Sequence, residues 1–206
     1  MQIKNTFKNI VAMTLAEVLI TLTIMGVVFS LTVPTLKANA DKKKMETLLQ
    51  KSYTTVSNAI DMSLANDPED SLTQWNFSNN EKMFDRLAKF INVQKVCSGG
   101  TEECFVKNYK FFSTGQYYNN AVSFMDEKSG IMAGDISFQF NECNGSSCHL
   151  HVDLNGPLEP NVIGYDYFEF VLHKDDTQAL TGYSGCGTDF CRTAEIMENN
   201  WEIKYW

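Results

Sequence analysis

Residues 11–36 read VAMTLAEVLITLTIMGVVFSLTVPTL, an apolar stretch that contains one ionisable side chain, Glu17. A helix of about 20 residues spans a hydrocarbon core of ~30 Å, so the stretch is long enough to cross a membrane. A carboxylate inside such a helix is strongly unfavourable and usually has a partner. The stretch therefore predicts a long N-terminal helix and raises the question of what pairs with Glu17.

Two general interpretations of this N-terminus leave Glu17 unexplained. The first is a secretory signal, because two lysines precede the apolar run and residues 38–40, Ala-Asn-Ala, form a small-residue cleavage site. The run over residues 10–33 is, however, longer than the roughly 7–15 residues of a signal core. The second is a plain membrane-spanning helix, whose length fits.

A third interpretation accounts for the acid. The sequence Ala12-Met13-Thr14-Leu15-Ala16-Glu17, placed between a short basic leader and the apolar run, resembles the processing site of type IV prepilins and type II secretion pseudopilins. The resemblance implies a leader over residues 1–12, cleavage between Ala12 and Met13 by a prepilin peptidase, and N-methylation of Met13. Ala12 and Met13 replace the glycine and phenylalanine that the family prefers, and Pro34 stands where the family often has a helix-kinking proline.

The same resemblance implies an assembly role for Glu17. Cleavage would create an ammonium group at Met13, one helical turn from Glu17. In the family's filaments, this acid pairs with the N-terminal amine of a neighbouring subunit. Because an unpaired carboxylate in a low-dielectric core is penalised far more than a matched pair, Glu17 would fix the register of docking subunits. The alternative is a tolerated polar residue near a helix end.

Beyond Pro34 the helical pattern continues in amphipathic form. The apolar residues at helical spacing are Met45, Leu48, Leu49, Tyr53, Val56, Ala59, Ile60 and Leu64. Pro68 should end the helix near Asn66. We therefore predict one helix over residues 13–66, whose first half (about 13–34) suits lipid or a filament core and whose second half suits packing against a sheet.

Residues 67–206 are predicted to form a globular head. A short amphipathic helix is expected over residues 81–93. Period-two patterns then predict strands at residues 121–125, 136–140, 148–154 and 168–172, with residues 201–206 as a possible last strand. Together these elements predict an α+β fold, with a long N-terminal helix packed on a small, mostly antiparallel sheet. This is also the head architecture that the pilin resemblance implies.

The six cysteines fall in three close pairs. They are Cys97 and Cys104, Cys143 and Cys148, and Cys186 and Cys191. In a chain with an N-terminal apolar segment, such pairs indicate disulfides and an oxidising compartment. Turn-forming residues lie within or beside each pair, which favours nearest-neighbour bridges, although other connectivities stay open. The head is therefore expected on the periplasmic or extracellular side of the inner membrane. The number of lysines in residues 37–44 favours the opposite orientation, with the head in the cytoplasm.

Residues 152–168 resemble a stretch common in pilin-like proteins with G-type pseudopilin heads, and several side chains here are oxygen donors. The possible calcium ligands are Asp153, Asn155, Asn161 and Asp166, or Asp175 and Asp176 further on. Their spacing does not match the twelve-residue calcium loop, and Asx residues in Gly/Pro-rich loops usually cap turns. We therefore predict no metal site and no cofactor, and Asp153, Asn155 and Asp166 are the candidates if a site exists.

The sequence does not predict an enzyme. Residues 182–186, Gly-Tyr-Ser-Gly-Cys, approach the nucleophile-elbow pattern but lack its final glycine. His149 and His151 share one face of a predicted strand and could ligate a metal, but no third ligand is near in the sequence. A nucleophile, base and oxyanion site cannot be assembled from these residues. The net charge of −8 also argues against non-specific nucleic-acid binding.

The leading hypothesis is a structural subunit of a type IV pilus or pilus-like filament. It would be held in the inner membrane as a single-pass protein and then assembled with other pilin or pseudopilin subunits into a filament or surface structure. A pseudopilin of a type II secretion system is the alternative within the family. Two alternatives belong to a different class: a secreted binding protein released after Ala40, and a membrane-anchored protein with a binding head.

Overall fold

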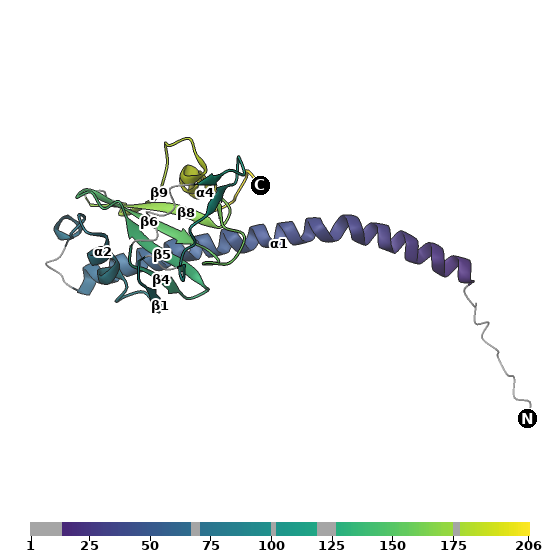
Figure 1. Ribbon diagram of the computed structural model, residues 1–206, viewed down its shortest axis with the longest axis horizontal. Coiled ribbons are helices and arrows are strands. Elements are labelled where there is room, and N and C mark those ends of the chain that lie inside the picture. Colours follow the sequence, from purple (N-terminus) through teal and green to yellow (C-terminus); the bar gives the residue numbers. More distant parts are fainter. Residues whose placement is uncertain (1–13, 67–70, 100–101, 119–126, 175–177) are drawn as a thin grey trace, which may run out of the picture. The chain divides into compact units, whose positions relative to one another are not determined.

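One helix dominates the N-terminal part of the chain. In the computed structural model, α1 runs without interruption from Leu15 to Asn66, a length of 52 residues (Figure 1). The structure describes residues 14–66, 71–99, 102–118, 127–174 and 178–206. The predicted helix is confirmed, and its last residue is the one expected before Pro68, which itself lies outside the described residues. Pro34 lies inside the helix.

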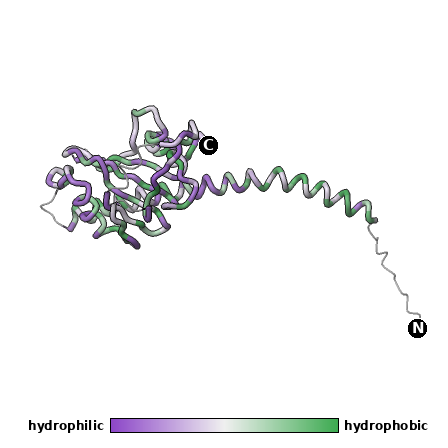
Figure 2. The backbone as a smooth tube through the Cα atoms, in the orientation of Figure 1, coloured by the Kyte–Doolittle hydropathy of each residue, from purple (hydrophilic) through white to green (hydrophobic). Residues whose placement is uncertain are grey.

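The chain divides into two units, residues 1–41 and residues 42–206. α1 contributes to both units. Its first part is exposed up to residue 40, and Figure 2 shows hydrophobic residues predominating there. Its second part carries a buried stripe that belongs to the core of the head: Met45, Leu49, Val56, Ala59 and Ile60.

The other elements belong to the second unit. The helical ones are η1 (Leu72–Gln74), α2 (Asn80–Leu87), η2 (Asp189–Cys191) and α4 (Arg192–Glu198). The strands are β1 (Val93–Cys97), β2 (Tyr109–Phe111), β3 (Tyr117–Tyr118), β4 (Ser129–Met132), β5 (Ile136–Asn141), β6 (Ser147–Asp153), β7 (Val162–Ile163), β8 (Tyr167–His173) and β9 (Leu180–Gly182).

Within the described residues these strands form a single nine-stranded sheet in the order β1-β4-β5-β6-β8-β7-β2-β3, with β9 also paired to β8. The pairings are antiparallel except those of β7 with β2 and with β8, which are parallel. The fold is therefore α+β, a long helix packed on a mostly antiparallel sheet, as predicted.

The predictions for the individual strands had mixed outcomes. The three predicted central strands are confirmed as β5, β6 and β8, within one residue of the expected ends. The predicted strand at residues 121–125 lies outside the described residues. The prediction of a last strand at residues 201–206 is wrong, because these residues have no regular secondary structure. Their contacts go to side chains and to a loop carbonyl instead of a neighbouring strand.

The short helix predicted over residues 81–93 is shorter than expected. α2 ends at Leu87, and Val93 already begins β1. Phe90 and Ile91 keep the helical spacing of apolar residues, but they lie in a turn whose N–H groups both donate to the Leu87 carbonyl. The asparagine before the helix, Asn79, caps it, with its side chain accepting from the Lys82 N–H at 2.7 Å.

The two faces of the central strands differ in chemistry. One face carries the main core, which includes Phe138 of β5, Leu150 of β6 and Phe170 of β8 and packs against α1 and α2. The other face carries polar side chains in cross-strand rows, Gln139–His151–Glu169 and Ser137–Asp153–Tyr167. These polar side chains are also buried. We call this second face the polar face.

Candidate functional site

The apolar part of α1 is the first candidate site. Large apolar side chains between Leu15 and Leu36 are exposed. Among the described residues, α1 is the one helix that is long and apolar enough to span a membrane. An apolar surface of this extent marks a contact with lipid or with other protein chains.

The hydroxyl groups within this segment are satisfied inside the helix itself. Each donates to a backbone carbonyl three or four residues earlier: Thr21 to Val18, Thr23 to Leu19, Ser30 to Val27, Thr32 to Val28 and Thr35 to Leu31, at 2.7–3.4 Å. In an apolar environment an unpaired hydroxyl would be strongly unfavourable. The internal bonds make this segment compatible with lipid despite its five hydroxyl residues.

Glu17 has a partner within its own chain. Thr14 donates to Glu17 Oε2 from its backbone N–H at 2.7 Å and from its hydroxyl at 2.9 Å. The Glu17 N–H in turn donates to Thr14 Oγ1 at 3.3 Å. This reciprocal arrangement is a capping box, in which Thr14 is the N-cap of α1 and Glu17 its third helical residue. Sequence reasoning missed it, although the order Thr-x-x-Glu before an apolar run is its signature.

The other predicted residues of the N-terminus have simpler outcomes. Ala12 and Met13, the predicted cleavage site, lie outside the described residues. Pro34 lies within the continuous α1. Because proline has no N–H, the carbonyl of Ser30 has no backbone donor four residues later.

The head is crosslinked by three local disulfides, Cys97–Cys104, Cys143–Cys148 and Cys186–Cys191. These are the nearest-neighbour pairs. Cys97, Cys104 and Cys148 are buried, whereas Cys186 is exposed. Cys97–Cys104 and Cys143–Cys148 join turns to β1 and β6, whereas Cys186–Cys191 joins the segment after β9 to η2.

A cluster of titratable side chains occupies the part of the polar face beside β9. His149 Nδ1 is hydrogen-bonded to Glu169 Oε1 and lies 3.8 Å from Glu142 Oε2. This hydrogen bond with Glu169 raises the pKa of His149, against the effect of burial. Burial lowers the pKa of His151, whose Nδ1 is hydrogen-bonded to the Tyr167 hydroxyl at 2.6 Å.

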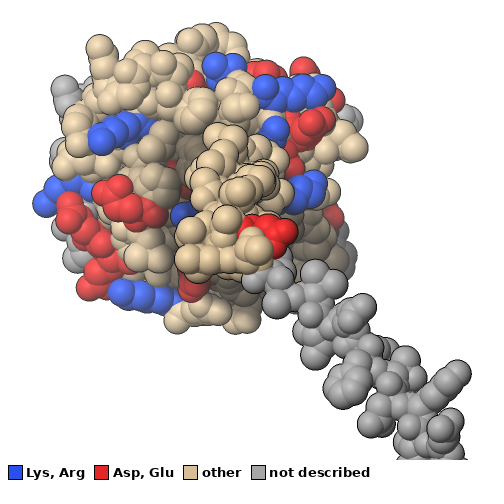
Figure 3. Space-filling model, turned by 90° about the vertical axis from the view of Figure 1, so that its right-hand side faces the viewer, with Lys and Arg blue, Asp and Glu red and all other residues tan. Residues whose placement is uncertain are grey.

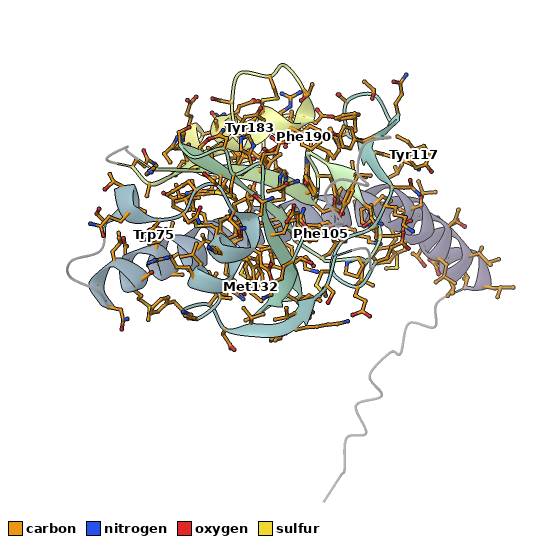
Figure 4. The ribbon with its side chains drawn as sticks, turned by 60° about the vertical axis from the view of Figure 1, so that its left-hand side comes forward. Trp75, Phe105, Tyr117, Met132, Tyr183 and Phe190 are labelled. Carbon is orange, nitrogen blue, oxygen red and sulfur yellow. A yellow bond between two sulfur atoms is a disulfide. The ribbon has the colours of Figure 1, made fainter. Side chains whose placement is uncertain are left out.

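A shallow pocket of about 180 Å³ opens over this cluster. Its lining includes His151, Glu169, Tyr183 and Phe190. Figure 4 shows Tyr183 and Phe190 side by side at this place. No group of three or more His, Cys, Asp and Glu side chains in the described part of the chain is arranged to hold a metal ion. His149 and His151 are hydrogen-bonded to Glu169 and Tyr167, respectively.

The nucleophile-like segment has a structural role. Gly182 ends β9 and lies against α4, where a Cβ would come within 2.5 Å of the Ala194 backbone nitrogen. Only glycine permits this close approach. Among the described residues, the hydrogen bonds do not join Ser184 to a histidine or a carboxylate.

At the other end of the polar face, Asp153 and Asp166 are both completely buried. The Tyr109 hydroxyl donates to Asp153 Oδ2 at 2.6 Å, and the Val162 N–H donates to Asp166 Oδ1 at 2.7 Å. Burial raises the pKa of both carboxyl groups, and the charge of Asp166 raises that of Asp153 further. Two neighbouring buried acids therefore lie at the end of β6 and directly before β8. Asp175 and Asp176 lie outside the described residues.

The charged surface of the head shows no area of a single sign on the face seen in Figure 3, where basic and acidic side chains are interspersed.

Comparison with models of known protein families, with curated proteins and with solved structures finds no match to this chain.

Proposed function

We propose that the chain is a structural subunit of a type IV pilus or pilus-like filament, held in the inner membrane by α1 before assembly. The observation that carries the proposal is the composition of α1. One uninterrupted helix supplies both an exposed apolar segment and a buried stripe in the core of a disulfide-crosslinked head. A cleavable secretory signal would need no such continuity between the apolar run and the folded head.

The internal hydroxyl bonds of α1 support the same proposal. A segment that first lies in lipid and then moves into a bundle of helices meets only apolar surroundings in both states. Its polar groups must therefore be satisfied within the helix in both states. The bonds from Thr21, Thr23 and Ser30 to backbone carbonyls meet this requirement without a partner chain.

Glu17 fits the proposal with one addition to the sequence hypothesis. Its Oε2 atom caps the helix through Thr14. Among the described residues, Oε1 makes no hydrogen bond, so it is the atom we assign to the methylated Met13 amine of a neighbouring subunit. Glu17 would then order its own helix end and accept the neighbour's positive charge at the same time.

The test is the N-terminus of the mature protein. Intact-mass spectrometry of the membrane-extracted chain should show loss of residues 1–12 and addition of one methyl group. A control variant, Ala12→Leu, should accumulate uncut, because the family prefers a small residue at this position. A mature chain beginning at Asp41 would support the secretory alternative, and an uncut chain would support a plain membrane anchor.

A further inference from the structure

Three aromatic side chains line the shallow pocket on the polar face. Tyr118 belongs to β3, Tyr183 directly follows β9, and Phe190 lies in η2. The rings of Tyr118 and Phe190 meet at 76°, with their centroids 5.1 Å apart, and Figure 4 shows Tyr183 beside Phe190. Because the face of an aromatic ring carries negative potential, rings gathered around one space favour a cation there. We call this space the aromatic pocket.

Two carboxylates line the same pocket. They belong to Glu142, which directly follows β5, and to Glu169 of β8. Burial raises the pKa of Tyr118 and of Tyr183, and the negative charges of both glutamates raise these pKa values further. Each carboxylate therefore lies close enough to affect both phenol rings.

The positive charge supplied by the protein does not balance these two acids. His149 Nδ1 is hydrogen-bonded to Glu169 Oε1 and lies 3.8 Å from Glu142 Oε2, so one imidazolium serves both carboxylates. None of the described residues that line the pocket is a lysine or an arginine. The Glu169 side chain is only 5% exposed, which reduces the screening of its charge by water. A negative charge therefore remains at the pocket even when His149 is protonated.

The walls of the pocket are held in place by the fold. The Tyr183 N–H donates to the Glu169 carbonyl at 3.1 Å, and the Tyr183 carbonyl accepts from the Ala194 N–H at 3.4 Å. The Cys186–Cys191 disulfide closes the segment that contains Phe190. A ligand would therefore lose little affinity to the ordering of these side chains.

The size and the polar groups of the pocket restrict the kind of cation. A volume of about 180 Å³ is below the roughly 300–1,000 Å³ of most ligand sites, so it suits one small group. A primary ammonium has three N–H donors that need acceptors once they leave water, and Glu169 Oε1 already bonds to His149. A quaternary ammonium has no N–H donor and is attracted by ring faces and by charge alone.

We propose that the aromatic pocket binds a small quaternary ammonium cation of the choline class. Tyr118, Tyr183 and Phe190 surround its methyl groups. Glu142 and Glu169 supply the opposite charge. The trimethylammonium group can come from a free molecule or from a lipid headgroup, and the chemistry of recognition is the same for both. This proposal does not depend on the filament proposal.

The test is a saturation-transfer NMR titration of the full chain in a maltoside detergent, with detergent alone as the blank. Choline chloride should bind with a Kd of about 1 mM or tighter, an affinity that several cation–π contacts can supply. Its uncharged carbon analogue, 3,3-dimethyl-1-butanol, has the same shape and should bind at least about tenfold more weakly. Ethanolamine, a primary ammonium, should also bind more weakly than choline.

Glycerophosphocholine distinguishes the two sources of the cation. It carries the trimethylammonium group of choline together with the phosphate of a lipid headgroup. Tighter binding of choline would assign the pocket to a free cation, because the added phosphate is repelled by the two glutamates. Tighter binding of glycerophosphocholine would assign it to a headgroup. Either result supports recognition of the trimethylammonium group.

Two pairs of variants test the walls and the charge. Tyr183→Leu removes a ring and should weaken choline binding about fivefold, whereas Tyr183→Phe keeps the ring and should bind as the parent does. Glu142→Gln should also weaken binding about fivefold, whereas Glu202→Gln removes an exposed acid outside the pocket and should have no effect.

Because Glu142 is exposed, its variant tests the proposal even if Tyr183→Leu does not fold. Three results would overturn the proposal. These are no binding of choline by the parent, binding of the uncharged analogue or of ethanolamine as tight as that of choline, and equal affinities of the parent and Glu142→Gln.

Discussion

The Ile203 N–H donates a hydrogen bond of 3.0 Å to Glu46 Oε1, which joins the C-terminal segment to α1 across 157 positions of the sequence. Glu46 is buried, and its other oxygen lies 3.2 Å from Lys43 Nζ. The last two residues are held in a similar way, because the Tyr205 hydroxyl and the Trp206 Nε1–H both donate to the Gly164 carbonyl. The C-terminus is therefore fixed by individual side-chain contacts.

We predict that Glu46→Ala destabilises the head by about 1–3 kcal/mol, because it leaves the buried Ile203 N–H without an acceptor. Glu46→Gln keeps an acceptor and should cost less. Lys43→Ala is the control, since Lys43 is largely exposed and its ion pair should contribute only about 0–1 kcal/mol. Urea unfolding of the full chain measures the three variants. Equal losses for Glu46→Ala and Lys43→Ala would contradict this role of the hydrogen bond.

The three disulfides should differ in their resistance to reduction. Cys186 is exposed, whereas Cys97 and Cys104 are buried together and Cys148 is buried in the main core. Thiol–disulfide exchange requires access to a sulfur atom, so the buried bridges must first open locally. An opening free energy above about 1.4 kcal/mol would slow their reduction more than tenfold.

Timed alkylation and mass spectrometry in mild dithiothreitol should therefore label Cys186 and Cys191 first. The same experiment in urea should abolish the order, because unfolding exposes all three bridges. Early labelling of Cys97 and Cys104 in the native protein would show that local opening does not protect them.

The stability of the head should depend on pH through His149. Its hydrogen bond with Glu169 raises its pKa in the folded state above the usual ~6.5. A raised histidine pKa contributes stability that is fully present below the unfolded pKa and is lost as the pH rises through the folded pKa. Glu142, His151 and Tyr183 also face this side chain. The contribution of His151 to stability changes with pH in the opposite direction. Burial lowers the pKa of His151, so its contribution is lost at low pH.

The parent should therefore exceed His149→Gln in unfolding free energy by about 1–2 kcal/mol near pH 5.5, and this difference should shrink toward pH 9. Chemical unfolding at several pH values measures it, and the effect of His151 largely cancels between the two proteins. In a Glu169→Gln background the pH dependence of the difference should become much smaller, because only Glu142 then raises the pKa of His149. A difference that stays constant with pH would mean that His149 contributes through packing alone.

The central strands could be predicted from the sequence because an alternation of residue types repeats along each of them. β5, β6 and β8 each place aromatic or aliphatic residues on one face and mainly polar residues on the other, over six or seven positions. β3, β7 and β9 contain two or three residues, too few for a period to be recognised. The irregular C-terminal segment has the composition of a strand, but Glu46, far away in the sequence, determines its position.

The two neighbouring buried acids of the polar face, Asp153 and Asp166, were visible in the sequence only as members of a set of oxygen donors. The spacing of Asp153, Asn155 and Asp166 matches no standard calcium loop. What distinguishes Asp153 in the structure is its complete burial beside Tyr109 and Ser137, which come from other strands and could not be placed there from the sequence. By contrast, the capping box of Thr14 and Glu17 is local, and its pattern could have been read directly from the sequence.

This capping box makes a precise test of Glu17 possible. Glutamine can occupy the same position of a capping box as glutamate, so Glu17→Gln removes the charge and retains the local hydrogen bonds with Thr14. Glu17→Val removes both. Thr14→Ala weakens the cap and keeps the charge.

If Glu17 pairs with the amine of a neighbouring subunit, the charge decides assembly. Glu17→Gln and Glu17→Val should then enter filaments poorly and to a similar extent, while both insert into the membrane at least as well as the parent, because an ionised side chain has been removed. Thr14→Ala should assemble nearly as the parent does. The measurement is the fraction of tagged variant recovered in sheared filaments from cells that also express the wild-type chain, compared with its amount in the membrane. Normal assembly of Glu17→Gln together with poor assembly of Glu17→Val would assign Glu17 to helix capping and would refute the register role.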